Sequence, residues 1–177
     1  MKAAVCRAFN EPLVIEELEL EGPQAGELVV DVKACAICHS DITYMDGGWG
    51  GALPALYGHE AAGVVSAVGP ETPGVAVGDH VVVTLIRSCG QCFYCSRGDR
   101  VMCETVLPLS ERQPITDASG APVAQMMNVG SFAEQVLVHH SQIAVMPKDV
   151  DFAVASLLGC GVITGVGAAI NTTSISP

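Results

Sequence analysis

Eight cysteines are spread through the 177 residues, and four of them stand close together in the middle of the chain. These four, Cys89, Cys92, Cys95 and Cys103, follow the pattern C-x2-C-x2-C-x7-C. Zinc in structural sites takes four thiolate or imidazole ligands at tetrahedral corners, and short spacers let one tight loop turn successive sulfurs inward. The pattern predicts a closed zinc site with a structural purpose. Two disulfides and an iron–sulfur cluster are the alternative interpretations.

A second group of residues indicates a site of a different kind. Cys35, Cys38 and His39 form a C-x-x-C-H segment, which also fits a c-type haem attachment, a redox-active cysteine pair or two buried thiols. Further along, His59 and Glu60 stand at the start of an apolar run. His59 could be an ordinary core histidine, but burying the Glu60 carboxylate among apolar residues is costly without a compensating charge. The pair therefore favours a nearby cation such as a metal ion.

The composition excludes several classes of protein. Half of the residues are hydrophobic and 15% are charged, which gives enough apolar surface for a folded core and excludes a disordered chain. The 19 acidic and 8 basic residues give a net charge of -11, so the chain lacks the positive surface that a nucleic-acid partner requires. Aromatic residues, at 5%, are too few for base stacking. The length suits about one domain.

The N-terminal segment predicts the compartment. Lys2 and Arg7 enclose an apolar run of only four residues, which is too short for the hydrophobic region of a signal peptide. We therefore expect a cytoplasmic protein with reduced cysteines and no membrane partner. Residues Phe152–Ile170 form an uncharged run of 19 residues, for which a membrane span is the competing interpretation. Its glycines and the lack of a flanking basic cluster favour a buried pair of helices.

The remaining pattern consists mostly of short strands. Runs rich in Val, Ile and Leu alternate with turn residues, which predicts an all-β barrel. Residues 85–129 read as long and largely irregular, which is typical of a functional or metal-stapled lobe. The expected strands are Lys2–Ala8, Leu13–Leu20, Glu27–Ala36, Gly63–Val68, His80–Thr84, Ser131–Val138 and Ile143–Met146, and the expected helices are Ser40–Met45, Phe152–Leu158 and Gly161–Ile170.

Several segments together resemble the zinc-dependent alcohol dehydrogenases of the medium-chain dehydrogenase/reductase family. The resemblance spans nearly the whole chain, and it is specific because the order and spacing of the segments agree as well as their residues. The segments are Cys38-His39-Ser40-Asp41, Gly58-His59-Glu60-x2-Gly63-x5-Gly69, Val77-Gly78-Asp79-His80-Val81, the four-cysteine segment and Gly159-Cys160-Gly161-Val162-Ile163-Thr164-Gly165-x-Gly167.

The resemblance implies a fold and its boundaries. It implies a mainly β, GroES-like barrel that forms the catalytic domain over residues 1–160, with short helices and a structural zinc lobe at about residues 85–105. Residues 161–177 would begin the connection to a dinucleotide-binding domain. No Gly-x-Gly-x-x-Gly opens a helix after a strand, so we expect that Rossmann domain to be absent from this chain.

The resemblance also implies two zinc ions and their ligands. Cys38, His59 and Cys160 match the protein ligands of a catalytic zinc, and two thiolates with one imidazole would leave the fourth position for water or substrate. Glu60 matches a residue that can approach that metal. The ligands of the structural zinc would be Cys89, Cys92, Cys95 and Cys103.

Further positions match residues around the reacting atoms. Ser40 matches the hydroxyl that accepts the substrate proton, and Asp41 matches the carboxylate that orients the ligand histidine. The cofactor contacts would be His39, beside the pyrophosphate, and Thr164, beside the nicotinamide. Pocket walls would be Leu85 and Trp49.

The implied activity is the interconversion of an alcohol and an aldehyde or ketone, with hydride transfer to NAD or NADP, in a complete enzyme that forms a homo-oligomer. Thr43 is a departure, because many relatives carry a proton-relaying histidine there; proton release would then use water, His39 or another path. This chain alone is expected to bind zinc, to bind NAD poorly and not to be a competent enzyme. The alternative hypothesis is a zinc-stapled binding module without catalysis.

Overall fold

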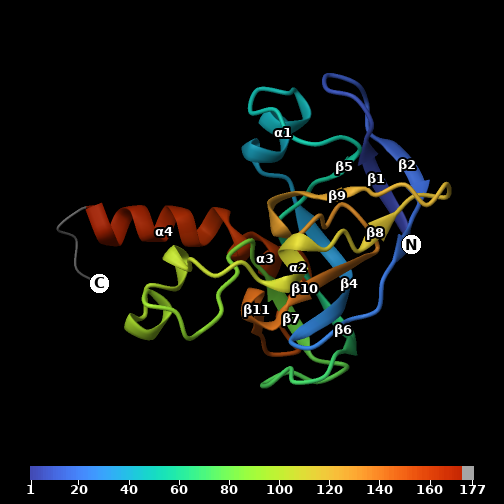
Figure 1. Ribbon diagram of the computed structural model, residues 1–177. Coiled ribbons are helices and arrows are strands. Elements are labelled where there is room, and N and C mark those ends of the chain that lie inside the picture. The colour runs from blue at the N-terminus through green and yellow to red at the C-terminus, as the bar shows by residue number, and fades with distance from the viewer. Residues whose placement is uncertain (173–177) are drawn as a thin grey trace.

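The computed structural model describes residues 1–172, and residues 173–177, the end of the predicted connection, lie outside the described residues. Within them, a five-stranded sheet has the order β10-β4-β6-β7-β11, a four-stranded sheet has the order β2-β1-β5-β9, and β3 pairs with β8 (Figure 1). The strands are β1 (Lys2–Cys6), β2 (Val14–Glu17), β3 (Glu19–Leu20), β4 (Glu27–Ala36), β5 (Ala55–Leu56), β6 (Glu60–Val68), β7 (His80–Val83), β8 (Ile115–Thr116), β9 (Ala124–Gln125), β10 (Gln135–His139) and β11 (Ile143–Val145).

The long pairing of β4 with β6 is the centre of the fold. Leu28 and Val30 of β4 and Val65 of β6 join Val81 of β7 and Val136 of β10 in the largest core cluster. Removing each such side chain from water contributes roughly 1.5–3 kcal/mol. The register of β4 against β6 shifts between Val32 and Ala34, and such a shift bends the strand toward closure. The predicted mainly β fold is confirmed.

The helices are short except at the C-terminal end. They are α1 (His39–Met45), α2 (Pro108–Glu111), α3 (Phe152–Ser156) and α4 (Gly161–Thr172), with 3-10 turns η1 (Cys95–Arg97), η2 (Arg100–Met102), η3 (Met126–Asn128), η4 (His140–Gln142) and η5 (Leu157–Gly159). Residues 85–129, expected to be irregular, contain only brief helical turns and the two-residue strands β8 and β9. The pairing of β5 with β9 was not foreseen, because two-residue strands carry no periodic signal.

The prediction of a buried pair of helices in Phe152–Ile170 is wrong for its second member. Helix α3 packs on the sheet through Ala155, which is fully buried against Ala62 and Val82. Helix α4 has no buried residue, and it extends away from the barrel (Figure 1). No single helix among residues 1–172 is long and apolar enough to cross a membrane, although the bent pair Phe152–Gly159 and Gly161–Thr172 meets that test by length and composition together.

Gly63 provides a test of how closely β4 and β6 approach. A Cβ at this position would overlap the carbonyl oxygen of Asp31 and lie 2.8 Å from Val30 Cγ1. We expect Gly63→Ala to lower the free energy of unfolding by about 1–3 kcal/mol, because the added methyl group must push the two strands apart. The measurement is urea unfolding of the zinc-loaded protein followed by circular dichroism.

Gly22→Ala is the matched control for this substitution. Nothing lies within 4 Å of a Cβ built at Gly22, and its φ is outside the left-handed region. We expect it to change the free energy of unfolding by less than about 0.5 kcal/mol. Equal effects of the two substitutions would show that the two strands tolerate a wider spacing.

Candidate metal centres

Four side chains from distant parts of the chain meet at the first candidate centre. One ligand atom each from Cys38, His59, Glu60 and Cys160 lies within 4.8 Å of all the others. Cys38 stands directly before α1, His59 lies between β5 and β6, and Cys160 lies at the break between η5 and α4. Packing of η5 against β6 and β7 brings the Cys160 segment back to the other two. The arrangement therefore depends on the complete barrel.

The buried carboxylate of Asp41 joins the elements that carry two of these side chains. One oxygen accepts a hydrogen bond from the Cys38 backbone N–H at 2.9 Å. The other accepts from the Gly58 N–H at 3.0 Å and contacts His59 Nδ1 at 3.1 Å. Asp41 is fully buried and His59 is nearly so. Because Nδ1 faces this carboxylate, Nε2 is the ring nitrogen left for a metal.

The pKa values at this centre favour charged forms of the first two ligands. Burial opposes ionisation of Cys38, but contacts with the backbone and hydroxyl of Ser40 and the nearby His59 ring outweigh it and lower the pKa of the Cys38 thiol. Burial favours a neutral His59, but its hydrogen bond to Asp41 and the charge of that carboxylate raise the pKa of the imidazole above its usual value. Metal binding requires the thiolate form of Cys38, which its lowered pKa favours, and loss of the proton from His59 Nε2.

Glu60 connects this centre to α4. Its carboxylate is buried at the first position of β6, and Oε2 accepts a hydrogen bond from the Gly161 N–H at 3.1 Å. The neighbouring Cys160 is half-buried, and desolvation raises the pKa of its thiol. The backbone N–H of Gly161 as a partner of Glu60 was not foreseen from the sequence, because the two residues are about 100 positions apart.

Of the other expected active-site residues, Ser40 and Thr164 lie beside the ligand sulfurs. The Ser40 hydroxyl lies 3.6 Å from Cys38 Sγ, and the Thr164 hydroxyl lies 3.9 Å from Cys160 Sγ. His39 is exposed at the first position of α1. The Thr43 hydroxyl donates to the His39 carbonyl oxygen at 3.1 Å, so it is bound within the helix.

Cys35 takes no part in the cluster. Its sulfur lies 3.2 Å from the Ser131 hydroxyl and 3.4 Å from the Ala36 carbonyl oxygen, at the end of β4. Its neighbour Cys38 instead faces Ser40 and the metal-binding group. The two sulfurs have separate surroundings, which does not favour a redox pair or a paired haem attachment.

The second candidate centre consists of Cys89, Cys92, Cys95 and Cys103, whose sulfurs lie within 4.8 Å of one another. All eight cysteines are free thiols. Cys89 Sγ accepts hydrogen bonds from the Cys92 N–H at 3.3 Å and from the Thr105 hydroxyl at 3.2 Å. Such donors stabilise a thiolate rather than a thiol. Thr105 was not foreseen as a member of this group, since a lone threonine carries no motif.

The charges of the four sulfurs cannot all be accommodated without a cation. The hydroxyl of Thr105 and the backbone N–H groups of Gln91 and Cys92 lower the pKa of Cys89 to about 6. Burial, followed by the sulfur of Cys92, raises the pKa of Cys95 to about 11. A divalent ion would remove this conflict by binding all four thiolates. Four sulfurs and no other donor are the ligand set of a closed zinc site.

The first centre offers a different ligand set. Two sulfurs and one imidazole are soft and borderline donors that suit zinc, and three such ligands leave one tetrahedral corner for another molecule. The carboxylate of Glu60 lies within reach as a further donor, and its Oε2 accepts a hydrogen bond from the Gly161 N–H. The residues of both centres thus fit zinc, one with four thiolates and the other with two thiolates, an imidazole and a neighbouring carboxylate.

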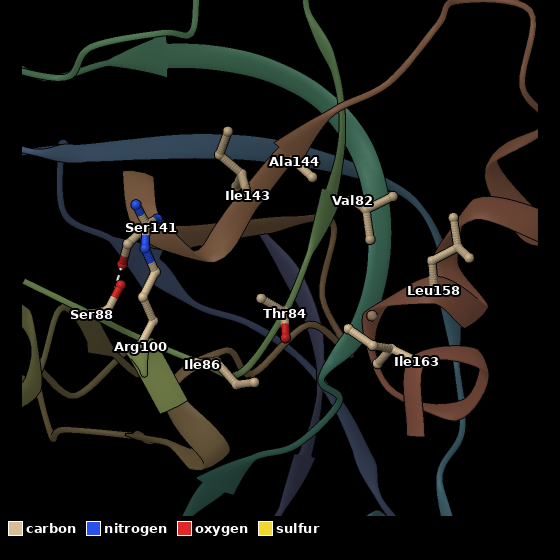
Figure 2. Close-up of a pocket in the computed structure, with 11 residues that line it drawn as sticks. Val82, Thr84, Ile86, Ser88, Arg100, Ser141, Ile143, Ala144, Leu158 and Ile163 are labelled. Atoms are coloured by element: carbon tan, nitrogen blue, oxygen red, sulfur yellow. Dashed lines mark hydrogen bonds between the residues drawn. The ribbon is translucent and has the colours of Figure 1, made fainter. Parts of the chain in front are cut away.

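An apolar cavity of about 290 Å³ lies beside the Cys160 segment. Figure 2 shows Val82, Ile143 and Ala144 of the sheet on one side and Leu158 and Ile163 on the other. Leu85 and Trp49 are not among the residues that line this cavity: Leu85 packs against the main core cluster, and Trp49 is 60% exposed with its ring in a T-shaped contact with Tyr44.

Metal content provides a direct test of both centres. We expect about two zinc ions per chain after dialysis, and loss of about one with either Cys103→Ser or Cys160→Ser, because each substitution removes one ligand from one centre. Atomic emission spectroscopy of the dialysed protein measures the number of zinc ions per chain. The control is Cys35→Ser, which should keep both ions because Cys35 contacts Ser131 instead. A full complement of zinc in Cys160→Ser would disprove the assignment of the first centre.

Comparisons with known proteins agree with this geometry. Residues 24–148 match the family described as the alcohol dehydrogenase GroES-like domain. Alcohol dehydrogenase B of Mycobacterium tuberculosis is 38% identical over 99% of this chain and 49% of its own length. S-(hydroxymethyl)glutathione dehydrogenase of Paracoccus denitrificans is 34% identical over 98% of this chain and 48% of its own. The chain therefore spans about half the length of these curated relatives.

Solved structures give the same result. An alcohol dehydrogenase zinc-binding domain protein from Burkholderia ambifaria superimposes with a TM-score of 0.89 at 36% identity, covering 97% of this chain and 48% of that one. Benzyl alcohol dehydrogenase from Acinetobacter calcoaceticus gives a TM-score of 0.85 at 32% identity, covering 99% and 49%. The chain belongs to the family of alcohol dehydrogenase GroES-like domains.

Proposed function

We propose that this chain provides the zinc-binding catalytic domain of an oxidoreductase that interconverts an alcohol and an aldehyde or ketone. The observation that carries the proposal is the meeting of Cys38, His59 and Cys160, since this donor set leaves a coordination position open. A zinc ion bound there would supply Lewis-acid activation of an alcohol or carbonyl oxygen. The names of the relatives support the same reaction class.

The proposed roles of the chain's own residues follow from their contacts. Asp41 would hold the His59 ring in one tautomer and keep Cys38 at its place before α1. Ser40, whose hydroxyl lies beside Cys38 Sγ, would accept the proton of the alcohol. Glu60 would keep the segment that carries Cys160 close to the metal through Gly161. Apolar surroundings exclude water and strengthen the electrostatic field of these groups.

The proton would then have to leave through water or through His39. Thr43 does not offer a base near neutral pH, and its hydroxyl already donates to the His39 carbonyl oxygen. His39 is exposed on the first turn of the same helix, where it can exchange protons with solvent. The arrangement favours a short path from Ser40 along the start of α1.

Binding of the cofactor would require residues outside the barrel. A nicotinamide cofactor, NAD or NADP, would supply the hydride acceptor. Residues 1–172 hold no dinucleotide-binding domain, so His39 and Thr164 would contribute only part of the contacts to the cofactor.

We propose that the catalytic domain extends to Cys160 and that the connection begins at Gly161. We also propose a cytoplasmic location, because the thiolate ligands require reducing conditions, and homo-oligomer formation in the complete enzyme.

Replacing Asp41 tests its role in positioning the metal ligands. We expect Asp41→Asn to weaken zinc binding at the first centre by roughly tenfold to a hundredfold, because the amide cannot accept from all three of its partners. Competition with a chelator measures this affinity, and retention of the zinc at the four-cysteine centre shows that the protein is folded. Asp46→Asn, an exposed change at the end of the same helix, should leave both affinities unchanged.

Cobalt substitution tests whether the open position accepts an alcohol. We expect the visible spectrum of the cobalt-loaded chain to change on addition of a primary alcohol, and the change to disappear in Cys160→Ser. The four-cysteine centre has no open position and should not respond, so Cys103→Ser should retain the change. A spectrum insensitive to alcohols and aldehydes would favour the alternative of a zinc-stapled binding module without catalysis.

A further inference from the structure

A polar cavity of about 170 Å³ lies on the side of the barrel formed by α2 and β9. Two arginines, Arg87 and Arg112, line it together with Ser110, Gln113, Gln125 and Asn128. None of these residues belongs to either metal centre. Its volume corresponds to several water molecules. Cationic side chains are scarce in this chain, which has 8 lysines and arginines against 19 acidic residues, so two of them at one small cavity require an explanation.

Arg87 is held in place entirely by neutral groups. Its Nε donates to Gln142 Oε1 at 2.7 Å, Nη1 donates to Ser110 Oγ at 3.0 Å, and Nη2 donates to the Asn128 carbonyl oxygen at 2.9 Å. No carboxylate forms an ion pair with it among residues 1–172. Burial lowers the pKa of Arg87 to about 10, and the charge of Glu27 offsets only part of this cost.

Arg112 leaves further donors unsatisfied. Its Nη2 binds the buried carboxylate of Glu27 at 2.7 Å, and its Nε lies 3.5 Å from Glu21 in a poorly aligned ion pair. Nη1 is buried and has no hydrogen-bond partner in the described part of the chain. Glu27 is also bound by the Gln24 N–H, so this carboxylate is already engaged and does not serve as the partner of Arg87. The two guanidinium groups therefore share the charge of one buried carboxylate, and only Arg112 has a second, exposed partner in Glu21.

The loop that closes the cavity is strained. Met127 and Asn128 have φ values of 51° and 61°, which are unfavourable for residues with a side chain. The carbonyl oxygen of Asn128 accepts from both Arg87 and Gln142, and these bonds keep the loop in this conformation. Backbone strain of this kind persists where the surrounding groups fix it, and it clusters at binding sites. The guanidinium of Arg87 is thereby preorganised.

From these observations we infer that the cavity binds a small oxyanion group, of the size of a phosphate or a carboxylate, between Arg87 and Arg112. The anion would accept hydrogen bonds from the guanidinium groups of Arg87 and Arg112 and from the Ser110 hydroxyl, since all three residues line the cavity. These are the planar, charge-assisted hydrogen bonds that guanidinium groups form with oxyanions. The bound negative charge would provide the counter-ion that Arg87 lacks.

Equilibrium dialysis of the zinc-loaded chain against radiolabelled inorganic phosphate tests this inference. We expect about one phosphate per chain, with binding weakened at least tenfold in Arg112→Gln and several-fold in Ser110→Ala. The milder second substitution keeps the test decisive if the first one unfolds the protein. Competition by acetate and sulfate identifies the anion: stronger displacement by acetate indicates a carboxylate ligand, and stronger displacement by sulfate indicates a tetrahedral one.

Two controls distinguish this site from other positive groups. Arg100→Gln removes an exposed arginine that lies beside His140 in a separate cavity and should leave phosphate binding unchanged. Cys160→Ser removes a ligand of the open metal centre and should also leave it unchanged. Binding that is lost in either control but kept in Arg112→Gln would overturn the inference. So would the absence of phosphate, sulfate and acetate binding at millimolar concentration, which would leave a water-filled cavity.

Discussion

The carboxylate of Asp41 is the constraint on which the first metal centre depends. A buried negative charge is stable only when donors surround it, and the donors here come from the start of α1, the turn at Gly58 and the His59 ring. Satisfying this one group therefore sets the position of Cys38 and the orientation of His59 together. The protein uses a single electrostatic requirement to align two segments that are about 20 residues apart. Metal binding can then take place on ligands that are already in place, which reduces the conformational entropy lost on binding.

The two centres differ in how far they rely on the rest of the fold. The four cysteines of the lobe lie within 15 residues, and their backbone N–H groups bind the sulfurs of the same loop, so this centre is local. The first centre requires Cys160, which follows the whole barrel in sequence. Close packing makes its return possible: Gly159 lies so near the Val83 carbonyl oxygen that a Cβ would approach it to 2.6 Å. The close packing at Gly159, the metal-binding sulfur of Cys160 and the N–H of Gly161 that binds Glu60 thus stand at three consecutive positions.

Much of this arrangement could be predicted from the sequence, and the exceptions have physical reasons. Strand β4 has the boundaries expected from its run of Val and Leu, because a long buried strand has a strong pattern. The two clusters were proposed from spacing and resemblance, and the structure brings their side chains together. The exposure of α4 was missed because an apolar helix without charges gives the same pattern whether or not another element covers it. The cavity with Arg87 was also missed, since its residues come from segments whose contacts have no sequence signature.

The bond between Glu60 and Gly161 has a mechanical consequence. It fastens the first turn of α4 to the first residue of β6, directly beside Cys160. The helix extends from this point as a rigid arm of 12 residues, roughly 18 Å long. If the helix tilted about its base, its far end would move most. The Cys160 sulfur and the Glu60 carboxylate, which lie near the base, would move only slightly. The direction of the arm and the positions of the Cys160 sulfur and the Glu60 carboxylate are therefore linked through this bond.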